Sequence, residues 1–202
     1  PPPALLNPGY GRAYFWAART TSHEEQVLAP ITDPNEMDLP LAEASTRIGL
    51  SADQISRALA SFVRSILSGN SRFDQFVNGD RTALTDAEQR GLAVFRGKGN
   101  CTACHVGPNF SDERTHNTGV AWSAAASALT DLGRFEVTGK DADRGAFKTP
   151  TLREITQTAP YMHDGSLTTL EDVLNFYEQG GRQNPHRDQE IRPVQFSNGE
   201  KD

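Results

Sequence analysis

The stretch Cys101-Thr102-Ala103-Cys104-His105 contains both cysteines of the chain. Two cysteines separated by two residues and followed directly by a histidine form the C-x-x-C-H pattern of covalent c-type haem attachment. Each thiol can form a thioether with a vinyl group of the same porphyrin. The histidine is carried beneath the ring, where an imidazole nitrogen can bind iron. The pattern therefore predicts one haem c, attached at Cys101 and Cys104, with His105 as its proximal iron ligand.

Two other chemistries compete for a cysteine pair of this spacing. A Cys101–Cys104 redox pair would need a surrounding βαβ pattern, which the neighbouring sequence lacks. A zinc site would need a second ligand pair at suitable spacing, and the adjacent Cys104 and His105 could not easily chelate one metal ion together. Haem attachment explains all three residues, and it is the interpretation that the motif favours.

The composition is typical of a soluble, loop-rich globular protein with room for one or two small domains. Of the 202 residues 36% are hydrophobic, 17 are glycine and 12 are proline, and the formal net charge is −6. The sequence has no basic patch that would indicate nucleic-acid binding. It also has no run of about 18 apolar residues that could span a membrane. Because bacteria attach haem c outside the cytoplasm, the motif predicts a periplasmic protein.

Helical signals dominate the rest of the chain, and the predicted fold class is all-α, with cytochrome c-like haem domains and long loops. Capping boxes or N-caps open three predicted helices, over 51–69, 85–97 and 170–178, at Ser51 with Gln54, Thr85 with Glu88, and Thr169. A shorter helix over His23–Leu28 is predicted to end at Pro30. Residues 106–150 have no sustained period and are predicted to be loops around the haem.

The helix predicted over 51–69 is indicated by apolar residues that continue until Gly69. They recur at helical spacing and are Ile55, Leu59, Phe62, Val63, Ile66 and Leu67. At the other end of the chain, Ser197 and Glu200 form a capping box just before the final residue. A helix beginning there predicts that the sequence is cut short at its C-terminus, and the triple proline at residues 1–3 suggests the same at its start.

Several motifs occur in an order that resembles the bacterial di-haem cytochrome c peroxidase and MauG family over nearly the whole chain. They are Pro3-Ala4-Leu5-Leu6-Asn7, Phe15-Trp16 followed by Arg19, Pro34-Asn35-Glu36-Met37, Phe73-Asp74, the Cys101–His105 motif, His116-Asn117-Thr118-Gly119, Gly133-Arg134-Phe135, residues 147–153 and residues 159–165. The resemblance implies two c-type haems on two helical domains, of which the single motif here corresponds to the second. Residues 1–84 would be the latter part of the N-terminal, peroxidatic haem domain, and residues 85–202 the C-terminal haem domain. A second C-x-x-C-H is expected upstream.

The resemblance also implies a distal iron ligand at Tyr177. Family peroxidases have a methionine there, fourteen positions after the histidine equivalent to His163, whereas MauG-like members have a tyrosine. A thioether favours reduced iron, while a hard, anionic phenolate stabilises ferric iron and higher oxidation states. Tyr177 also lies on the apolar face of its predicted helix, so a core tyrosine is the competing interpretation. Met162, the other candidate ligand, does not match the family's ligand position.

Three residues correspond to the family's peroxide pocket. Glu36 matches the acid–base carboxylate, which takes a proton from the near peroxide oxygen and delivers it to the leaving one. Gln26 and Pro30 line the same pocket by analogy. Without the resemblance, a glutamate in a polar loop would be interpreted as solvated surface.

Trp16 corresponds to the indole between the two haems, where it would carry electrons or holes; a core tryptophan is the competing interpretation. Most members have Asp-Gly where this chain has Ala17-Ala18, so the hydrogen bonds around Trp16 must differ. Thr158 and Pro160 match positions whose carbonyls bind calcium. The third calcium ligand of the family would fall on Pro1, which departs from the expected asparagine.

Three functions follow as hypotheses. The first is a MauG-like enzyme that uses hydrogen peroxide to oxidise side chains, tryptophan above all, of a partner protein, and Tyr177 favours it. The second is a peroxidase that reduces hydrogen peroxide with electrons from a small cytochrome or cupredoxin. The third is a non-enzymatic, mono-haem electron carrier, which would have no use for Glu36. The acidic balance could help to dock a basic electron donor. His23, His116 and His186 are predicted to be surface or loop-stabilising residues.

Overall fold

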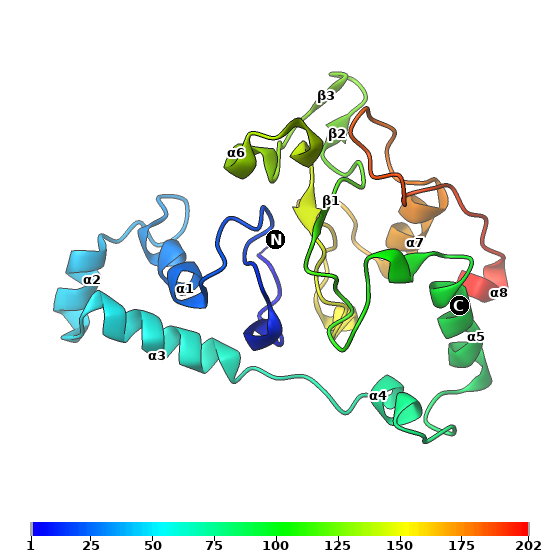
Figure 1. The fold of residues 1–202 in the computed structure, drawn as a ribbon, viewed down its shortest axis with the longest axis horizontal. Coiled ribbons are helices and arrows are strands. Elements are labelled where there is room, and N and C mark those ends of the chain that lie inside the picture. Colours follow the sequence, from blue (N-terminus) through cyan, green and yellow to red (C-terminus); the bar gives the residue numbers. More distant parts are fainter. Residues whose placement is uncertain (1, 202) are drawn as a thin grey trace.

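The computed structural model describes residues 2–201, in which helices and long loops predominate (Figure 1). The α-helices are α1 (His23–Thr32), α2 (Leu41–Ile48), α3 (Ala52–Arg64), α4 (Arg72–Val77), α5 (Asp86–Arg96), α6 (Phe135–Thr138), α7 (Leu170–Glu178) and α8 (Asn198–Lys201). Short 3-10 turns are η1 (Pro8–Tyr10), η2 (Cys101–Ala103), η3 (Asp141–Asp143) and η4 (Ile155–Gln157). The strands are β1 (Thr115–His116), β2 (Trp122–Ser123), β3 (Ala128–Leu129) and β4 (Phe147–Lys148).

The strands form two small antiparallel pairs inside the region predicted to be loops. β1 pairs with β4, so that His116 lies opposite Phe147, and β2 pairs with β3. The predicted predominance of helix is confirmed. The predicted all-α fold class is incomplete, because the structure also contains these two antiparallel strand pairs. Strands of two residues are too short to leave a periodic signal in the sequence, so no pattern could have predicted them.

Local capping decides where the main helices begin, as predicted. Ser51 and Gln54 form a capping box at α3, and Thr85 and Glu88 form one at α5. Thr169 caps α7, with Asp172 completing a box that the sequence analysis did not identify. Each box satisfies backbone N–H groups that a helix start leaves without partners.

Helix ends were predicted less well than helix starts. α1 continues to Thr32 with Pro30 inside it, so the prediction that Pro30 ends this helix is wrong. Pro30 lies in the last turn, where its missing N–H removes a single hydrogen bond to the preceding turn and only Ile31 and Thr32 follow it in the helix. α3 ends at Arg64 instead of Gly69, because the Ser65 N–H bonds to the carbonyls of Phe62 and Val63 in a tightened last turn.

The core of the first part lies where α1 and α2 pack on α3. One cluster joins Val27, Ala60 and Val63, and a second joins Ile31, Ala44 and Ile55. The predicted apolar face of α3 is thus only partly buried. Phe62 is 67% exposed and Leu59 is 36% exposed, because α1 and α2 cover only one side of α3.

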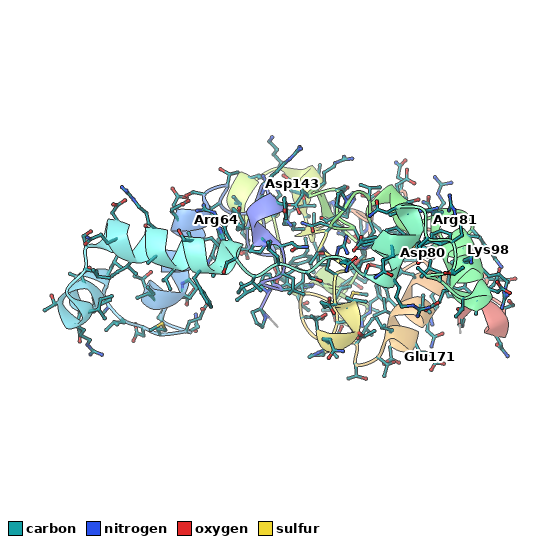
Figure 2. All side chains as sticks on the ribbon, turned by 90° about the horizontal axis from the view of Figure 1, so that it is seen from below. Arg64, Asp80, Arg81, Lys98, Asp143 and Glu171 are labelled. Carbon is teal, nitrogen blue, oxygen red and sulfur yellow. The ribbon has the colours of Figure 1, made fainter. Side chains whose placement is uncertain are left out.

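The molecule is extended, with α1–α3 at one end and α4, α5, α7 and α8 at the other (Figure 1). The N-terminal segment and the strands lie between them. Figure 2, seen from below, shows Arg64 at the end of α3 and Lys98 towards the opposite end of the molecule. The predicted domain boundary after residue 84 falls between α4 and α5, and it remains a prediction. Within residues 2–201, no helix is both long enough and apolar enough to cross a bilayer.

Candidate functional site

The Cys101–His105 motif forms a tight turn directly after α5. Asn100, in the left-handed region with φ 52°, redirects the chain into η2. The N–H groups of Cys104 and His105 then both donate to the Cys101 carbonyl, at 3.4 and 2.9 Å. Both cysteines are free thiols, and both are partly buried. The turn therefore holds the two sulfurs and the imidazole on one short, hydrogen-bonded segment.

His105 is prepared as a metal ligand by a contact within the chain. Its Nδ1 lies 2.7 Å from the carbonyl oxygen of Phe110, and as an N–H it donates there, which leaves Nε2 free. Burial lowers the pKa of the imidazole below its ordinary value, so the ring is neutral. A neutral imidazole whose second nitrogen is held by a carbonyl is the usual form of a metal-binding histidine. A cavity of about 180 Å³ adjoins it, lined among others by Phe73, Leu92, Phe95, Thr102 and Phe110.

The structure brings Tyr177 towards the same motif. Burial raises the pKa of its phenol, and the charges of Cys104 and Cys101 acting through space raise it further, while a hydrogen bond with Thr118 opposes them. Tyr177 is therefore a neutral, partly buried phenol that interacts electrostatically with the two sulfurs. Binding as a phenolate requires the positive charge of a metal ion next to it.

Glycines hold the end of α7, and with it Tyr177, against the segment that contains Thr118. Gly181, with φ 67°, lies so close that a Cβ there would come within 2.2 Å of the Thr118 carbonyl oxygen. A Cβ on Gly119 would come within 2.1 Å of the Arg182 carbonyl oxygen. Only glycine allows the two backbones to approach in this way.

A second arrangement of donors near the motif could suggest a metal site. One side-chain atom each of Cys104, Asp112 and His116 lie within 4.8 Å of one another. His116, however, makes short contacts to carboxylates with both ring nitrogens, Nδ1 to Asp188 and Nε2 to Asp112 at 2.8 Å. Hydrogen bonds to the Cys104 sulfur, Asp188 and Asp112 raise the pKa of His116 to about 10 in spite of burial. A doubly protonated imidazole has no lone pair for a metal, so His116 is a loop-stabilising residue, as predicted.

The donor set fits a covalently attached haem c. Cys101 and Cys104 would hold the group through thioethers, and His105 and Tyr177 would supply the iron ligands. A zinc ion would need further ligands, and the charged His116 cannot provide one.

The loop that carries Trp16 is fixed by residues more than a hundred positions away. The Lys148 N–H donates to the Trp16 carbonyl at 2.7 Å. One nitrogen of Arg134, Nη1, donates to the carbonyls of both Ala17 and Ala18, at 3.1 and 2.7 Å. With alanines in place of the family's Asp-Gly, backbone carbonyls and Arg134 thus hold this loop. This function of Arg134 was not predicted from the sequence, although Gly133-Arg134-Phe135 was among the matching motifs.

The three residues predicted for the peroxide pocket lie around the end of α1. Gln26 and Pro30 are one helical turn apart, and the Met37 N–H donates to the Pro30 carbonyl at 3.1 Å, which places Glu36 next to this end of the helix. Gln26 and Pro30 are partly buried, but Glu36 is exposed. The structure therefore gathers the three residues without enclosing the carboxylate.

Two further predicted residues have simple surroundings. Thr158 donates its hydroxyl to the Ile155 carbonyl, and Pro160 is exposed and follows a cis peptide bond. Pro1, where the family's third calcium ligand would fall, lies outside the described residues. The calcium site remains a prediction.

His23 was predicted to be a surface or loop-stabilising residue, and this prediction is wrong. It is 2% exposed, and its ring stacks on Tyr14 with centroids 4.8 Å apart. Neither ring nitrogen has a hydrogen-bond partner among the described residues. Val27 and Ile31 follow at intervals of four and share its buried face, so this spacing was the signal that could have placed it in the core.

Comparison with known proteins identifies related sequences and structures. The model of the di-haem cytochrome c peroxidase family matches residues 1–82. The methylamine utilization protein MauG of Methylorubrum extorquens is 36% identical over 98% of this chain and 60% of its own. The cytochrome-c peroxidase IdrP2 of Denitromonas iodatirespirans is 30% identical over 98% of this chain and 64% of its own. The chain thus spans a little under two thirds of the length of these curated relatives.

A solved structure agrees over a larger share of its length. A MauG-like protein described as associated with microbial copper homeostasis superimposes with a TM-score of 0.87. It is 30% identical, and the match covers 98% of this chain and 69% of that one. On sequence and structure together, the chain belongs to the di-haem cytochrome c peroxidase and MauG family.

Proposed function

We propose that this chain carries the C-terminal haem of a periplasmic di-haem oxidoreductase that uses hydrogen peroxide. In this proposal the enzyme is MauG-like and oxidises side chains, above all tryptophan, of a partner protein. Haem is attached at Cys101 and Cys104, and residues 1–84 and 85–202 belong to its two haem domains. Family membership supports the peroxide chemistry, and the relative named MauG supports the subgroup.

The observation that carries the choice of subgroup is the position of Tyr177. Its phenol is partly buried, and the two sulfurs of the attachment motif act on it electrostatically through space. When bound, the haem supplies one-electron oxidation and reduction of iron, and a hard, anionic oxygen ligand favours its oxidised states. A methionine at this position would favour storage of an electron, which suits a peroxidase better.

The remaining site residues have separate tasks in this proposal. His105, oriented by the Phe110 carbonyl, binds iron through Nε2. Trp16 carries electrons or holes from a loop that Arg134 and Lys148 hold still. The Glu36 carboxylate moves a proton between the two peroxide oxygens, for which it needs a covered, poorly solvated position. Thr158 and Pro160 bind calcium through their carbonyls.

A peroxidase that takes electrons from a small cytochrome or cupredoxin is the second candidate. The 30% identity to a protein named cytochrome-c peroxidase favours it, since this relative matches as much of the chain as MauG does. The mono-haem carrier has less support, because family relatives are named as enzymes and a carrier would not need a proton-moving carboxylate.

Tyr177→Phe and Tyr177→Met, made in the full-length holoprotein, test the choice between the two candidates. Wild-type protein is expected to lack a methionine–iron charge-transfer band and to oxidise reduced mono-haem cytochrome c slowly. With peroxide it is expected to oxidise a tryptophan-containing peptide, and Tyr177→Phe should reduce that rate at least tenfold. Tyr161→Phe is the matched control, because within the described part of the chain the Tyr161 hydroxyl bonds to the Ile155 carbonyl and to no residue of the motif. Fast cytochrome c oxidation by the wild type would establish the peroxidase instead.

A further inference from the structure

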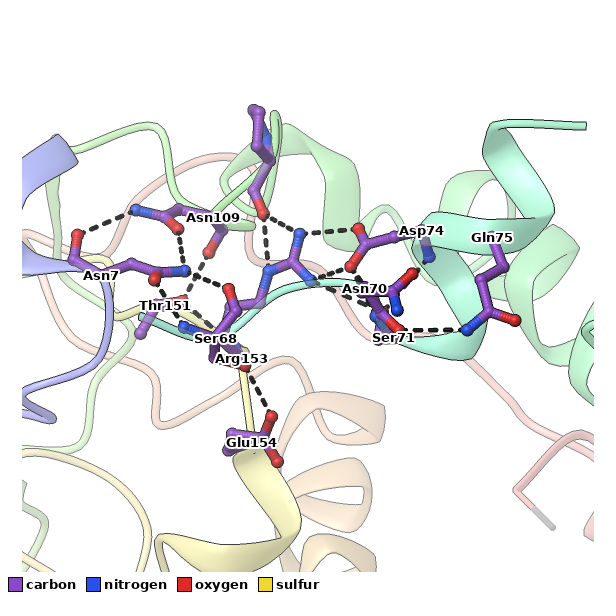
Figure 3. A network of polar contacts seen from close by, with 11 residues as sticks. Asn7, Ser68, Asn70, Ser71, Asp74, Gln75, Asn109, Thr151, Arg153 and Glu154 are labelled. Carbon is purple, nitrogen blue, oxygen red and sulfur yellow. Dashed lines mark hydrogen bonds and ion pairs between the residues drawn. The ribbon is translucent and has the colours of Figure 1, made fainter. Parts of the chain in front are cut away.

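Arg153 occupies a buried position between α4 and the turn that follows the haem-attachment motif (Figure 3). Its Nη1 and Nη2 donate to the two carboxylate oxygens of Asp74 at 2.6 and 2.8 Å. Its Nε and Nη2 also donate to the Pro108 carbonyl, at 2.8 and 2.6 Å. One guanidinium thus connects α4 to the backbone of the 107–110 turn, with only 8% of the residue exposed.

The same turn orients His105. The Phe110 carbonyl accepts the hydrogen bond from Nδ1 of His105, and the Phe110 ring lies 5.3 Å from the Arg153 guanidinium carbon. Thr151 donates its hydroxyl to the Asn109 carbonyl at 2.7 Å. The carbonyls of Pro108 and Asn109 are therefore held by segment 151–153, while the Phe110 carbonyl remains for the imidazole.

α4 supplies the other half of this support. Asp74 is itself fixed, because it forms the capping box at the start of α4 with Ser71. The guanidinium of Arg153 holds the pKa of the Asp74 carboxyl well below its usual range, so the pair is charged. Phe73 of the same helix packs on Phe110, with ring centroids 4.9 Å apart. α4 therefore contacts the turn through both an ion pair and an aromatic pair.

We propose that Arg153, held by Asp74, is a positioning residue for His105 and sets the reduction potential of the haem bound there. Arg153 fixes the backbone that presents the Phe110 carbonyl to Nδ1. A strong Nδ1–H···O=C bond makes Nε2 a better donor to iron, which stabilises the oxidised state and lowers the potential. The inference rests on the proposed haem attachment at Cys101, Cys104 and His105.

The ion pair also gives α4 a direct effect on the C-terminal haem. Asp74 and Arg153 are 79 positions apart, on opposite sides of the predicted domain boundary. A displacement of α4 would move the guanidinium, the Pro108 carbonyl and then the hydrogen bond to His105. The reduction potential of this haem therefore depends on the position of α4 relative to the 107–110 turn.

Substitutions of Arg153 in the full-length holoprotein test the proposal. Arg153→Met removes all donors and should raise the reduction potential of the haem that peptide mapping locates at Cys101 and Cys104. Arg153→Lys keeps the positive charge, but an ammonium group cannot donate to Asp74 and Pro108 with the planar geometry of a guanidinium. It should therefore raise the reduction potential by a smaller amount. Asp74→Asn keeps the contacts to Pro108 and should also give a small upward shift.

Arg72→Lys and Arg72→Met are the matched controls. Arg72 also lies on α4, but its hydrogen bonds among residues 2–201 go to Glu88, through both Nη atoms, and to the Ala83 carbonyl, and none goes to the 107–110 turn. These variants should leave the potential at its wild-type value. If Arg153→Met fails to fold, Arg153→Lys and Asp74→Asn still test the proposal, because both keep a polar group at the buried position.

Three results would overturn the proposal, and each has a different meaning. Covalent haem on every variant with unchanged potentials would show that Arg153 does not act on His105, while leaving the proposed function intact. Absence of covalent haem from the wild-type peptide containing Cys101 and Cys104 would refute the attachment itself, and both proposals with it. Equal shifts in the Arg153 and Arg72 variants would show a general electrostatic effect and would also contradict the proposal.

Discussion

In the His105 region each polar side chain of the site has a partner within the chain, whereas in the Glu36 region the proposed carboxylate lies exposed in a turn. His105 is bonded to Phe110, and Arg153 is bonded to Asp74 and Pro108. The Glu36 backbone N–H bonds to the Asp33 carbonyl, and its carboxylate has no hydrogen-bond partner among residues 2–201. Both regions contain motifs that match the family. Only in the His105 region, however, are the functional side chains held in place by hydrogen bonds.

The difference shows what each region needs before it can work. The C-terminal ligand set is preorganised by hydrogen bonds whose donors and acceptors all lie within residues 2–201. An acid–base role for Glu36 requires a surface that covers it, which these residues do not provide. The first region should therefore tolerate changes in the second without a change in its spectrum.

The largest effect is expected from Glu36→Gln, which removes the proton-moving group and keeps the shape of the side chain. Peroxide turnover should fall at least about 100-fold, which corresponds to about 2.7 kcal/mol in the barrier. The absorbance spectrum of the haem at His105 should not change. Glu43→Gln is the control, since Glu43 is an exposed glutamate of the next helix that pairs with Arg47. Turnover at the wild-type rate would remove Glu36 from the mechanism, and a changed spectrum would show that the regions are not independent.

A smaller effect is expected from Arg134→Met, which removes two hydrogen bonds to the loop of Trp16. Loss of a charged donor from these carbonyls should reduce the free energy of unfolding by about 2 kcal/mol. It should also shift the Trp16 fluorescence maximum to longer wavelength, measured with Trp122→Phe in the background. Arg57→Met is the control, because Arg57 pairs with Asp53 of its own helix α3 and both side chains are largely exposed. An unchanged emission spectrum would show that Arg134 does not hold the loop.

The smallest effect, and the only stabilising one, is expected from His23→Leu. Leucine fills the buried position without two unpartnered nitrogens, so the free energy of unfolding should rise by about 1 kcal/mol. Denaturant unfolding at neutral pH measures this difference. A loss of stability would show instead that His23 has a partner outside residues 2–201.

The same variant should change the pH dependence of stability. Burial lowers the pKa of His23 below its ordinary 6.5, helped by Arg64 and opposed by Glu24. The unfolded chain therefore takes up a proton at this residue as the pH falls through 6.5, and the folded chain does not. Wild-type stability should decrease over that range, and the decrease should be smaller in His23→Leu. Identical slopes would show that His23 does not titrate differently on folding.

Much of the secondary structure and the motif chemistry could be predicted, because both depend on residues close in sequence. A capping box involves residues three positions apart, as in Thr85 and Glu88, so the sequence shows both members together. The C-x-x-C-H spacing likewise places two sulfurs and an imidazole on one turn wherever it occurs. The tyrosine at position 177 was identified only through the family resemblance, since periodicity alone describes it as a core residue.

Pairs of residues that are far apart in the sequence could not be predicted from the sequence. Nothing near Arg153 indicates that its partner is Asp74, and nothing near His116 indicates Asp188, 72 positions away. A charged side chain can be solvated or paired, and only the folded chain decides which. The same holds for Arg134, whose acceptors are backbone carbonyls and carry no signal of residue type.

The sequence by itself determined where the main helices begin, where haem is expected to attach and which family the chain resembles, because these depend on short-range chemistry. The tertiary structure alone decided that His23 is buried, that Phe62 is exposed and that α1 continues past Pro30. It also placed Arg153 between α4 and the His105 turn. These outcomes depend on which surfaces meet, and that is set by packing over the whole chain.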